Sequence, residues 1–134
     1  MTVIWYPSTL DVLGLHRYIM AATGGVQGLR DEGALAGALA RPRMAAYYQG
    51  ADLAEQAALL IAGIALAHAF VDGNKRTGLI TGDVFLDRNG LLFEADPARI
   101  ASAIVALVEA ENAEGRASRF AELAGLIGRD SHAQ

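Results

Sequence analysis

The chain has 134 residues, 53% of them hydrophobic, and a net charge of -4, which indicates one folded domain over residues 1–134 rather than a disordered segment. The excess of acidic residues argues against broad nucleic-acid binding, which needs a basic face. There is no cysteine, which excludes disulfides and thiolate metal sites, and the longest apolar run, about eleven residues, is shorter than the roughly 20 that a membrane span needs, so we expect a cytoplasmic protein without membrane contact.

The N-terminal third predicts two helices. Apolar residues recur at helical rather than alternating spacing, and the first helix is expected to begin after a capping Ser8 or Thr9 and to end at Gly24-Gly25. The second is expected to begin after a capping Asp31 and to end before Pro42, because proline disfavours the helical conformation of the residue before it. The segment Arg43–Gly50 carries two tyrosines and no helical stripe. We interpret it as a surface flap.

Two further helices are expected at the centre of the domain. The first runs from a capping Asp52 to about His68 and is apolar around most of its circumference, which predicts burial. The second runs from about Asn74 to Arg88 and is stopped by Asn89-Gly90, a common left-handed end.

The remaining chain predicts two more helices and a tail. Asp96-Pro97 is a typical helix start, with a capping side chain before a proline at the first helical position, and the apolar face of that helix extends to Gly115. A last helix is expected over about residues 117–127, and the tail from about residue 128 to 134 is expected to be disordered. The prediction is a compact all-α domain of about six helices with a central helix-loop-helix.

The segment between the two central helices carries the candidate chemistry. It reads His68-Ala-Phe-Val-Asp-Gly-Asn-Lys-Arg76. A helix that begins near Asn74 would point its free backbone N–H groups and positive dipole end at the preceding loop, which suits phosphate. Gly73 allows the loop to bend, while Lys75 and Arg76 add positive charge.

Two side chains of this segment suit the other parts of a phosphoryl- or nucleotidyl-transfer site. Asp72 could bind a magnesium ion, which takes one or two protein carboxylates and leaves its other positions to phosphate and water. His68 could accept a proton from an incoming hydroxyl. Its spacing from Ile61 and Ile64 places it on the buried side of its helix, which would hold the ring firmly.

Each of these residues also has a purely structural interpretation. A lone histidine at a helix C-terminus often satisfies free carbonyl groups. Asp72 and Asn74 are both common capping residues. Lys75 and Arg76 could form a solvated surface, although two cations at a helix N-terminus oppose the dipole and therefore indicate an anion.

The nine-residue segment resembles the signature of the Fic/Doc superfamily, and specifically of its Doc branch. Fic-type members carry His-Pro-Phe-x-x-Gly-Asn-Gly-Arg-x-x-Arg, whereas Doc-type members have Asn-Lys-Arg, as at residues 74–76 here. Ala69 replaces the proline, and Leu79 stands in place of the last arginine. Upstream residues add to the resemblance, which covers roughly residues 3–127: Gly24-Gly25, Leu29–Gly33 and Ala38–Pro42.

The resemblance implies a Fic/Doc helical fold and a function. It implies a Doc-like kinase, the toxin of a type II toxin-antitoxin system, that transfers the γ-phosphate of ATP to a hydroxyl of a protein. The target would be elongation factor Tu, so that translation is inhibited, and a small Phd-like antitoxin would neutralise the toxin. By resemblance His68 is the catalytic base, Asp72 binds Mg²⁺, and the nucleotide is bound by Gly73, Asn74, Lys75 and Arg76.

The resemblance leaves two alternatives open. One is a Fic-type AMP transferase, and the other is an inactive module that binds a nucleotide or a partner. Lys75 fills space that the glycine of Fic-type members would leave, and Leu79 lacks the phosphate contact that an arginine would make there. Both differences from the Fic-type motif favour the kinase. In the superfamily a flap presents a strand edge to the target, and on this basis we expect target or antitoxin contact at Arg43, Tyr47 and Tyr48.

Overall fold

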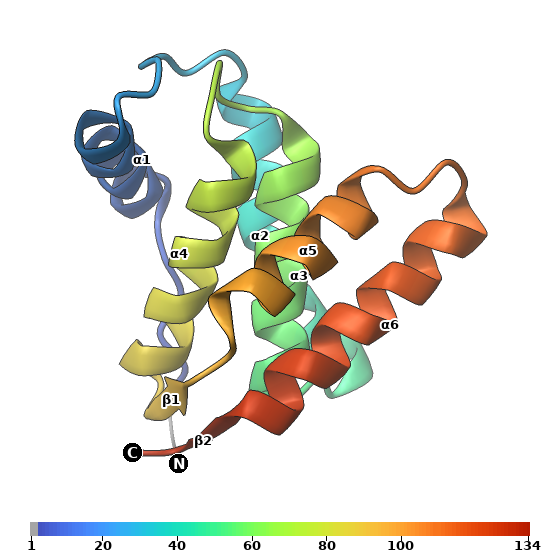
Figure 1. The fold of residues 1–134 in the computed structure, drawn as a ribbon. Helices are drawn as coiled ribbons and strands as arrows, with labels where there is room; N and C mark the ends of the chain where they lie inside the picture. Colours follow the sequence, from blue (N-terminus) through green and yellow to red (C-terminus); the bar gives the residue numbers. More distant parts are fainter. Residues whose placement is uncertain (1–2) are drawn as a thin grey trace.

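The computed structural model describes residues 3–134 and consists mainly of helices (Figure 1). The helices are α1 (Thr9–Thr23), α2 (Glu32–Gln49), α3 (Leu53–Ala67), α4 (Asn74–Arg88), α5 (Pro97–Val108) and α6 (Ala113–Asp130). Two three-residue strands, β1 (Leu91–Phe93) and β2 (Ser131–Ala133), pair in antiparallel orientation. The expected all-α fold class is confirmed.

Helix α3 lies at the centre of the molecule and packs against α2, α4 and α6. Most of its apolar side chains between Ala57 and Ala65 are buried, as the sequence predicted, and they join one core cluster to which all six described helices contribute. Two glycines bring α4 close to α3: a Cβ on Gly78 would lie 2.8 Å from the carbonyl oxygen of Ile61, and one on Gly82 would overlap the Ile61 side chain. This close packing fixes the two ends of the loop that joins α3 to α4.

The described helices differ in how they begin. Side chains cap the N-termini of five of them: Ser8, Asp31, Asp52, Asp96 and Asn112. Such a cap is typically worth about 1 kcal/mol of stability. Helix α4 begins after Gly73 without any side-chain cap.

Helix α2 corrects the prediction of a flap at Arg43–Gly50. The helix continues through Pro42 and ends at Gln49, and Gly50 closes it in the left-handed conformation. A proline inside a helix costs about 3 kcal/mol, but Pro42 is buried together with Leu35, Ala38 and Leu39, at the spacing of one helix face. Packing of this face against α3 therefore outweighs the local signal.

The C-terminal region differs from the prediction in a similar way. Helix α5 ends at Val108, well before Gly115, and α6 extends from Ala113 to Asp130. Where a disordered tail was expected, the chain pairs with β1 in the register Leu91↔Ala133, and the Gln134 side-chain amide donates to Asp87 Oδ1 at 2.8 Å. The paired strand residues are about forty positions apart in sequence, so no local pattern marks this pairing.

Within residues 3–134 no helix is both long enough and apolar enough to cross a bilayer.

Candidate functional site

The loop between α3 and α4, residues 68–73, begins with an unusual backbone conformation. His68 closes α3 with φ 49° and ψ 39°, and within residues 3–134 it is the one non-glycine residue with positive φ. This left-handed conformation turns the chain away from the helix axis and leaves the His68 side chain exposed. The expectation that His68 lies on the buried side of the helix is wrong, because the residue has left the helical path.

The backbone around His68 is held by an extended segment that precedes α2. The carbonyl oxygen of Ala69 accepts hydrogen bonds from Arg30 N at 2.6 Å and Asp31 N at 3.0 Å, and Val71 N donates to Gly28 O at 3.0 Å. Gly28 has φ 141°, which few other residues adopt. The extended segment beside the loop is therefore residues 28–31, which the sequence did not indicate, rather than residues 43–50.

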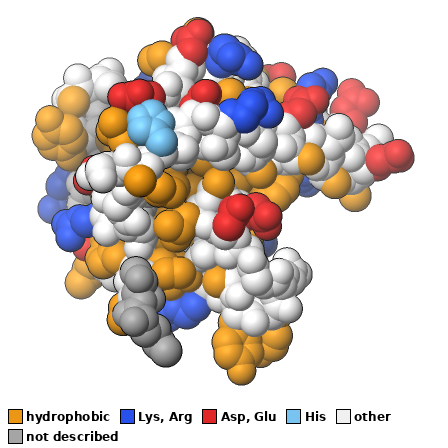
Figure 2. Space-filling view, turned by 90° about the horizontal axis from the view of Figure 1, so that it is seen from below, with side chains coloured by type: hydrophobic (Ala, Val, Ile, Leu, Met, Phe, Trp, Pro, Cys, Tyr) orange, Lys and Arg blue, Asp and Glu red, His pale blue; other side chains and the backbone are white. Residues whose placement is uncertain are grey.

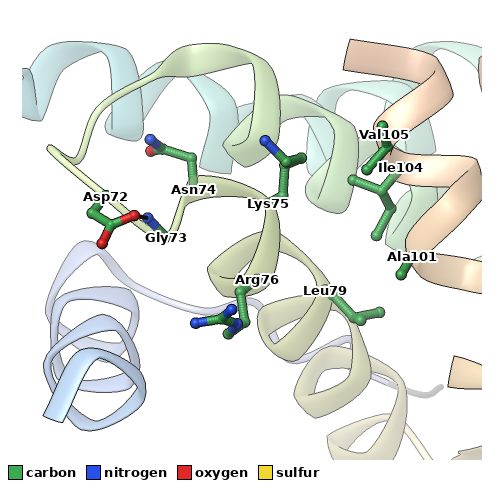
Figure 3. Close-up of a pocket in the computed structure, with 9 residues that line it drawn as sticks. All are labelled: Asp72, Gly73, Asn74, Lys75, Arg76, Leu79, Ala101, Ile104 and Val105. Atoms are coloured by element: carbon green, nitrogen blue, oxygen red, sulfur yellow. Dashed lines mark hydrogen bonds between the residues drawn. The ribbon is translucent and has the colours of Figure 1, made fainter. Parts of the chain in front are cut away.

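Asn74 closes the loop from the other side. Its Oδ1 accepts a hydrogen bond from Phe70 N at 3.0 Å, and its Nδ2 donates to Phe70 O at 2.9 Å. Figure 3 shows this side chain turned toward the loop, away from Arg76 and Leu79. Both groups of the Asn74 side-chain amide are thus bonded to the loop, and the binding of nucleotide by Asn74 stays a prediction.

The N-terminus of α4 is open to a ligand. Gly73 is left-handed, with φ 77°, and a Cβ at this position would overlap the Met20 side chain. The first intrahelical bond runs from Thr77 N to Gly73 O at 2.9 Å. The N–H groups of residues 74–76 precede it and carry the positive end of the helix dipole, and this arrangement binds anions.

Asp72 is held as a carboxylate beside this helix end. Its Oδ2 accepts a hydrogen bond from Val26 N at 3.0 Å, and its Oδ1 accepts one from Gly73 N at 2.8 Å. The bond from Val26 is the largest cause that lowers the pKa of Asp72, and the bond from Gly73 and the charge of Arg76 lower the pKa further. Asp72 therefore does not cap the free N–H groups of α4, which was one of the two sequence interpretations.

The donor set fits a magnesium ion that shares its coordination with phosphate. No group of three histidine, cysteine, aspartate or glutamate side chains that could hold a metal occurs within residues 3–134, which disfavours an all-protein metal cage there. Mg²⁺ commonly takes only one or two carboxylates and completes its shell with phosphate oxygens and water. Asp72, exposed and ionised, could supply that one carboxylate.

Lys75 and Arg76 are both exposed on the first turn of α4. Arg76 Nη1 donates to Thr23 Oγ1 at 3.0 Å, and Figure 3 shows the two side chains leaving the helix in different directions, with Arg76 toward α1. A guanidinium binds phosphate as a two-pronged fork and an ammonium as a point charge. The two cations could therefore contact an anion from two sides.

A cavity of about 350 Å³ brings these residues together (Figure 3). One part of its wall is polar and consists of Asp72, Gly73, Asn74, Lys75 and Arg76. The other part is apolar and consists of Leu79 of α4 and Ala101, Ile104 and Val105 of α5. His68 is not part of this lining, so the structure gathers the expected phosphate and metal residues and leaves the expected base at the other end of the loop.

The structure does not bring Arg43, Tyr47 and Tyr48 to this site. They lie near the C-terminus of α2, next to the N-terminus of α3, and α3 extends 15 residues to the other end of the molecule, about 22 Å at 1.5 Å per residue. The Arg43 guanidinium carbon lies 4.7 Å from the centroid of the Tyr6 ring. The side chains of Tyr47 and Tyr48 are exposed. Figure 2 views this end of the molecule and shows hydrophobic side chains exposed there between charged ones of both signs.

The sequence interpretation did not identify His16 of α1, which contacts the loop between α3 and α4. It is buried in α1, its Nε2 lies 2.8 Å from the carbonyl oxygen of Asp72, and its ring stacks on Phe70 with centroids 3.8 Å apart. A signal was present in the sequence, because His16 lies four residues after Val12 and four before Met20 on the buried face of α1.

Comparisons with known proteins agree with the motif. A model of the Fic/DOC family matches residues 6–86, more than half of the chain. "Toxin Doc" from Mycolicibacterium smegmatis is 43% identical over 79 residues, which cover 56% of this chain and 59% of that protein. "Protein kinase doc" from Escherichia phage P1 is 34% identical over 82 residues, which cover 60% of this chain and 65% of that protein. In both cases the chain spans less than two thirds of the relative's length.

Proposed function

Because the chain belongs to the Fic/DOC family, we propose that it is a Doc-like kinase that transfers the γ-phosphate of ATP to a hydroxyl of a protein. The observation that carries the proposal is the uncapped N-terminus of α4, which faces the cavity beside a held carboxylate and two cations. One relative is named a protein kinase, which supports the choice of reaction.

The helix end and the two cations would bind the phosphates. The N–H groups of the first turn of α4 donate to phosphate oxygens without further rearrangement of the backbone, since Gly73 and Asn74 already fix the loop. Arg76 and Lys75 add charge-assisted contacts. Asp72 would hold a magnesium ion, which supplies neutralising charge to the phosphate oxygens. Positioning and electrostatic stabilisation of this kind supply most of the catalysis in phosphoryl transfer.

His68 would act as the general base. Its exposed imidazole would accept the proton of the target hydroxyl while that oxygen bonds to the γ-phosphorus. The bond between the γ-phosphorus and the bridging oxygen breaks, and ADP leaves. The left-handed backbone of His68 and the hydrogen bonds that the Ala69 carbonyl accepts from residues 30 and 31 fix the point from which the side chain extends.

AMP transfer is the second candidate reaction, and Leu79 argues against it. An arginine at this position would add a further phosphate contact, whereas Leu79 continues the apolar wall formed by Ala101, Ile104 and Val105. The cavity thus offers phosphate contacts at one end only. This asymmetry supports a nucleotide placement different from that of the arginine-bearing Fic-type enzymes.

ATP labelled separately at the α or the γ phosphorus distinguishes the two reactions. The protein is incubated with Mg²⁺ and with ATP labelled at either the α or the γ phosphorus, using purified elongation factor Tu or a bacterial lysate as acceptor. The proposal predicts that only the γ label reaches protein. Transfer of the α label alone would establish AMP transfer, and transfer of neither label would support a binding module without turnover.

We propose further that the protein is the toxin of a toxin-antitoxin pair, that it acts on elongation factor Tu, and that a small Phd-like antitoxin neutralises it. The relative named "Toxin Doc" supports the toxin assignment. A growth assay tests it: expression of the unaltered chain should slow bacterial growth, and expression of His68→Asn should not. Equal growth of the two strains would contradict a toxic activity that depends on His68.

A further inference from the structure

Asp72 accepts hydrogen bonds from α1 and from the segment that directly follows it. Its carboxylate accepts a hydrogen bond from Val26 N, just after α1, and its carbonyl oxygen accepts one from His16 Nε2 within α1. Because a carbonyl oxygen can only accept, Nε2 must carry a hydrogen. Both the main chain and the side chain of Asp72 therefore depend on where α1 lies.

The ring of His16 is fixed by its surroundings. Only 3% of the residue's surface is exposed, and the ring lies nearly parallel to the ring of Phe70, with an angle of 9° between the planes. Phe70 is in turn bound through its backbone N–H and carbonyl to Asn74. The contacts run without a gap from α1 through the loop to the first residue of α4.

We infer that His16 is a positioning residue for the carboxylate of Asp72: its Nε2–H holds the Asp72 carbonyl so that the side chain meets Val26 N, Gly73 N and an incoming ion together. The inference rests on the proposed function only in assigning the ion to Asp72. Hydrogen-bond partners of metal-binding residues typically change metal affinity or activity about 10- to 100-fold when they are removed.

An ordinary packing role for His16 makes different predictions. If the residue only filled the core, phenylalanine would replace it without loss, since it preserves the stacked ring and buries no polar atom. Glutamine would be the worse substitute for packing. It can nevertheless donate from an Nε2 that lies as many bonds from the backbone as that of histidine, so the two substitutions separate packing from donation.

Amide hydrogen exchange measured by NMR tests the positioning role without any nucleotide. In the unaltered protein the Val26 and Gly73 amides donate to Asp72, and Asp72→Asn supplies the reference for a weakened pair. We expect His16→Phe to accelerate the exchange of both amides by about tenfold, as suits the loss of hydrogen bonds to a charged group. His16→Gln should keep the exchange within about twofold of the unaltered protein, given the donor that it retains.

Val12→Ala is the matched control. Val12 lies on the same buried face of α1, four residues before His16, and is fully buried, so its truncation loosens α1 without removing the donor. Exchange at Val26 and Gly73 should change less in Val12→Ala than in His16→Phe. If His16→Phe does not fold, His16→Leu serves as the donor-free variant. Unchanged exchange in either folded donor-free variant would overturn the inference.

Calorimetric titration with magnesium and ATP together connects the position of Asp72 to binding. We expect about tenfold weaker binding for His16→Phe and nearly unchanged binding for His16→Gln. Equal binding by the unaltered protein and His16→Phe would overturn the inference. Absence of binding by the unaltered protein would overturn the proposed function, and the exchange experiment would still decide whether His16 positions Asp72.

Discussion

Helices α3 and α4 form the central hairpin of the domain, yet they begin in opposite ways. At the start of α3, Asp52 Oδ1 accepts a hydrogen bond from Glu55 N at 2.8 Å, and Glu55 adds a negative charge to the first turn. At the start of α4 there is no side-chain cap and no acidic residue, and the first turn instead carries Lys75 and Arg76.

The difference separates a helix end that its own side chains stabilise from one that, on the proposed function, binds a ligand. A cap and an acidic first turn stabilise a helix N-terminus by about 1 kcal/mol and by about 0.3–1 kcal/mol respectively. Helix α4 has no side-chain cap, and the positive charges of Lys75 and Arg76 in its first turn are unfavourable toward the helix dipole. Its position is secured by close packing on α3 through Gly78 and Gly82, so its N-terminus can stay free for an anion.

The largest expected effect belongs to the base at the ligand end. We expect His68→Asn to lower phosphoryl transfer about 100- to 10,000-fold, because general-base catalysis contributes on this scale. Asparagine tolerates the left-handed conformation of this position, so the thermal unfolding midpoint should change little. Transfer of the γ label of ATP to protein measures the rate.

His132→Asn is the control for this prediction. His132 is an exposed histidine of β2 that pairs with Glu94, and its replacement should leave the transfer rate unchanged. Comparable transfer by His68→Asn and the unaltered protein would remove His68 from the mechanism.

The next effect concerns Asp72 and its dependence on pH. We expect Asp72→Asn to weaken the binding of magnesium with ATP at least about tenfold, on the scale of changes around metal ligands. The Val26 hydrogen bond lowers the pKa of the Asp72 carboxyl in the folded state. The ionised Asp72 therefore stabilises the fold above the ordinary aspartate pKa of about 3.9, and this stabilisation is lost as the pH falls through the lower folded-state pKa.

Calorimetric titrations at several pH values check the prediction for Asp72. The loss of affinity caused by Asp72→Asn should be the same at neutral pH and at about pH 5, because Asp72 stays ionised across this range and protonation of the ATP phosphates affects both proteins. A midpoint in this range that disappears in Asp72→Asn would contradict the assigned direction of the pKa shift.

At the start of α3 the expected effect is on stability alone. Asp52→Ala should lower the free energy of unfolding by about 1 kcal/mol, the usual cost of losing a cap. Chemical denaturation measures the change. Binding of magnesium with ATP should not change, since Asp52 lies at the opposite end of α3 from the cavity; an equal loss of binding would break the distinction between the two helix ends.

The smallest effect has opposite signs for stability and binding. Lys75→Ala should raise the free energy of unfolding of the nucleotide-free protein by about 0.3–1 kcal/mol, because it removes a cation from the positive end of the α4 dipole. The same substitution should weaken binding of ATP with magnesium. Denaturation without nucleotide and calorimetric titration provide the two values, and a loss of both stability and binding would show that Lys75 supports the fold.

Features marked by neighbouring residues could be predicted from the sequence. The bounds of α4 follow from Gly73 and Asn89-Gly90, and the buried position of α3 follows from its apolar circumference. The gathering of Asp72, Lys75 and Arg76 at one helix end follows from their adjacency in sequence.

Features made by packing between distant residues could not be predicted in this way. Pro42 continues α2 because a buried helix face outweighs a local signal. His68 leaves its helix, and the loop is held by residues 28–31, about forty positions upstream. The contact of His16 with Asp72 joins residues 56 positions apart. Helical periodicity places His16 in the interior but does not name its partner.

A crystal structure with magnesium and a non-hydrolysable ATP analogue tests the central claim most directly. The account predicts phosphate oxygens on the N–H groups of the first turn of α4, with the ion on Asp72. Binding of the analogue elsewhere, with this helix end still facing solvent, would contradict it.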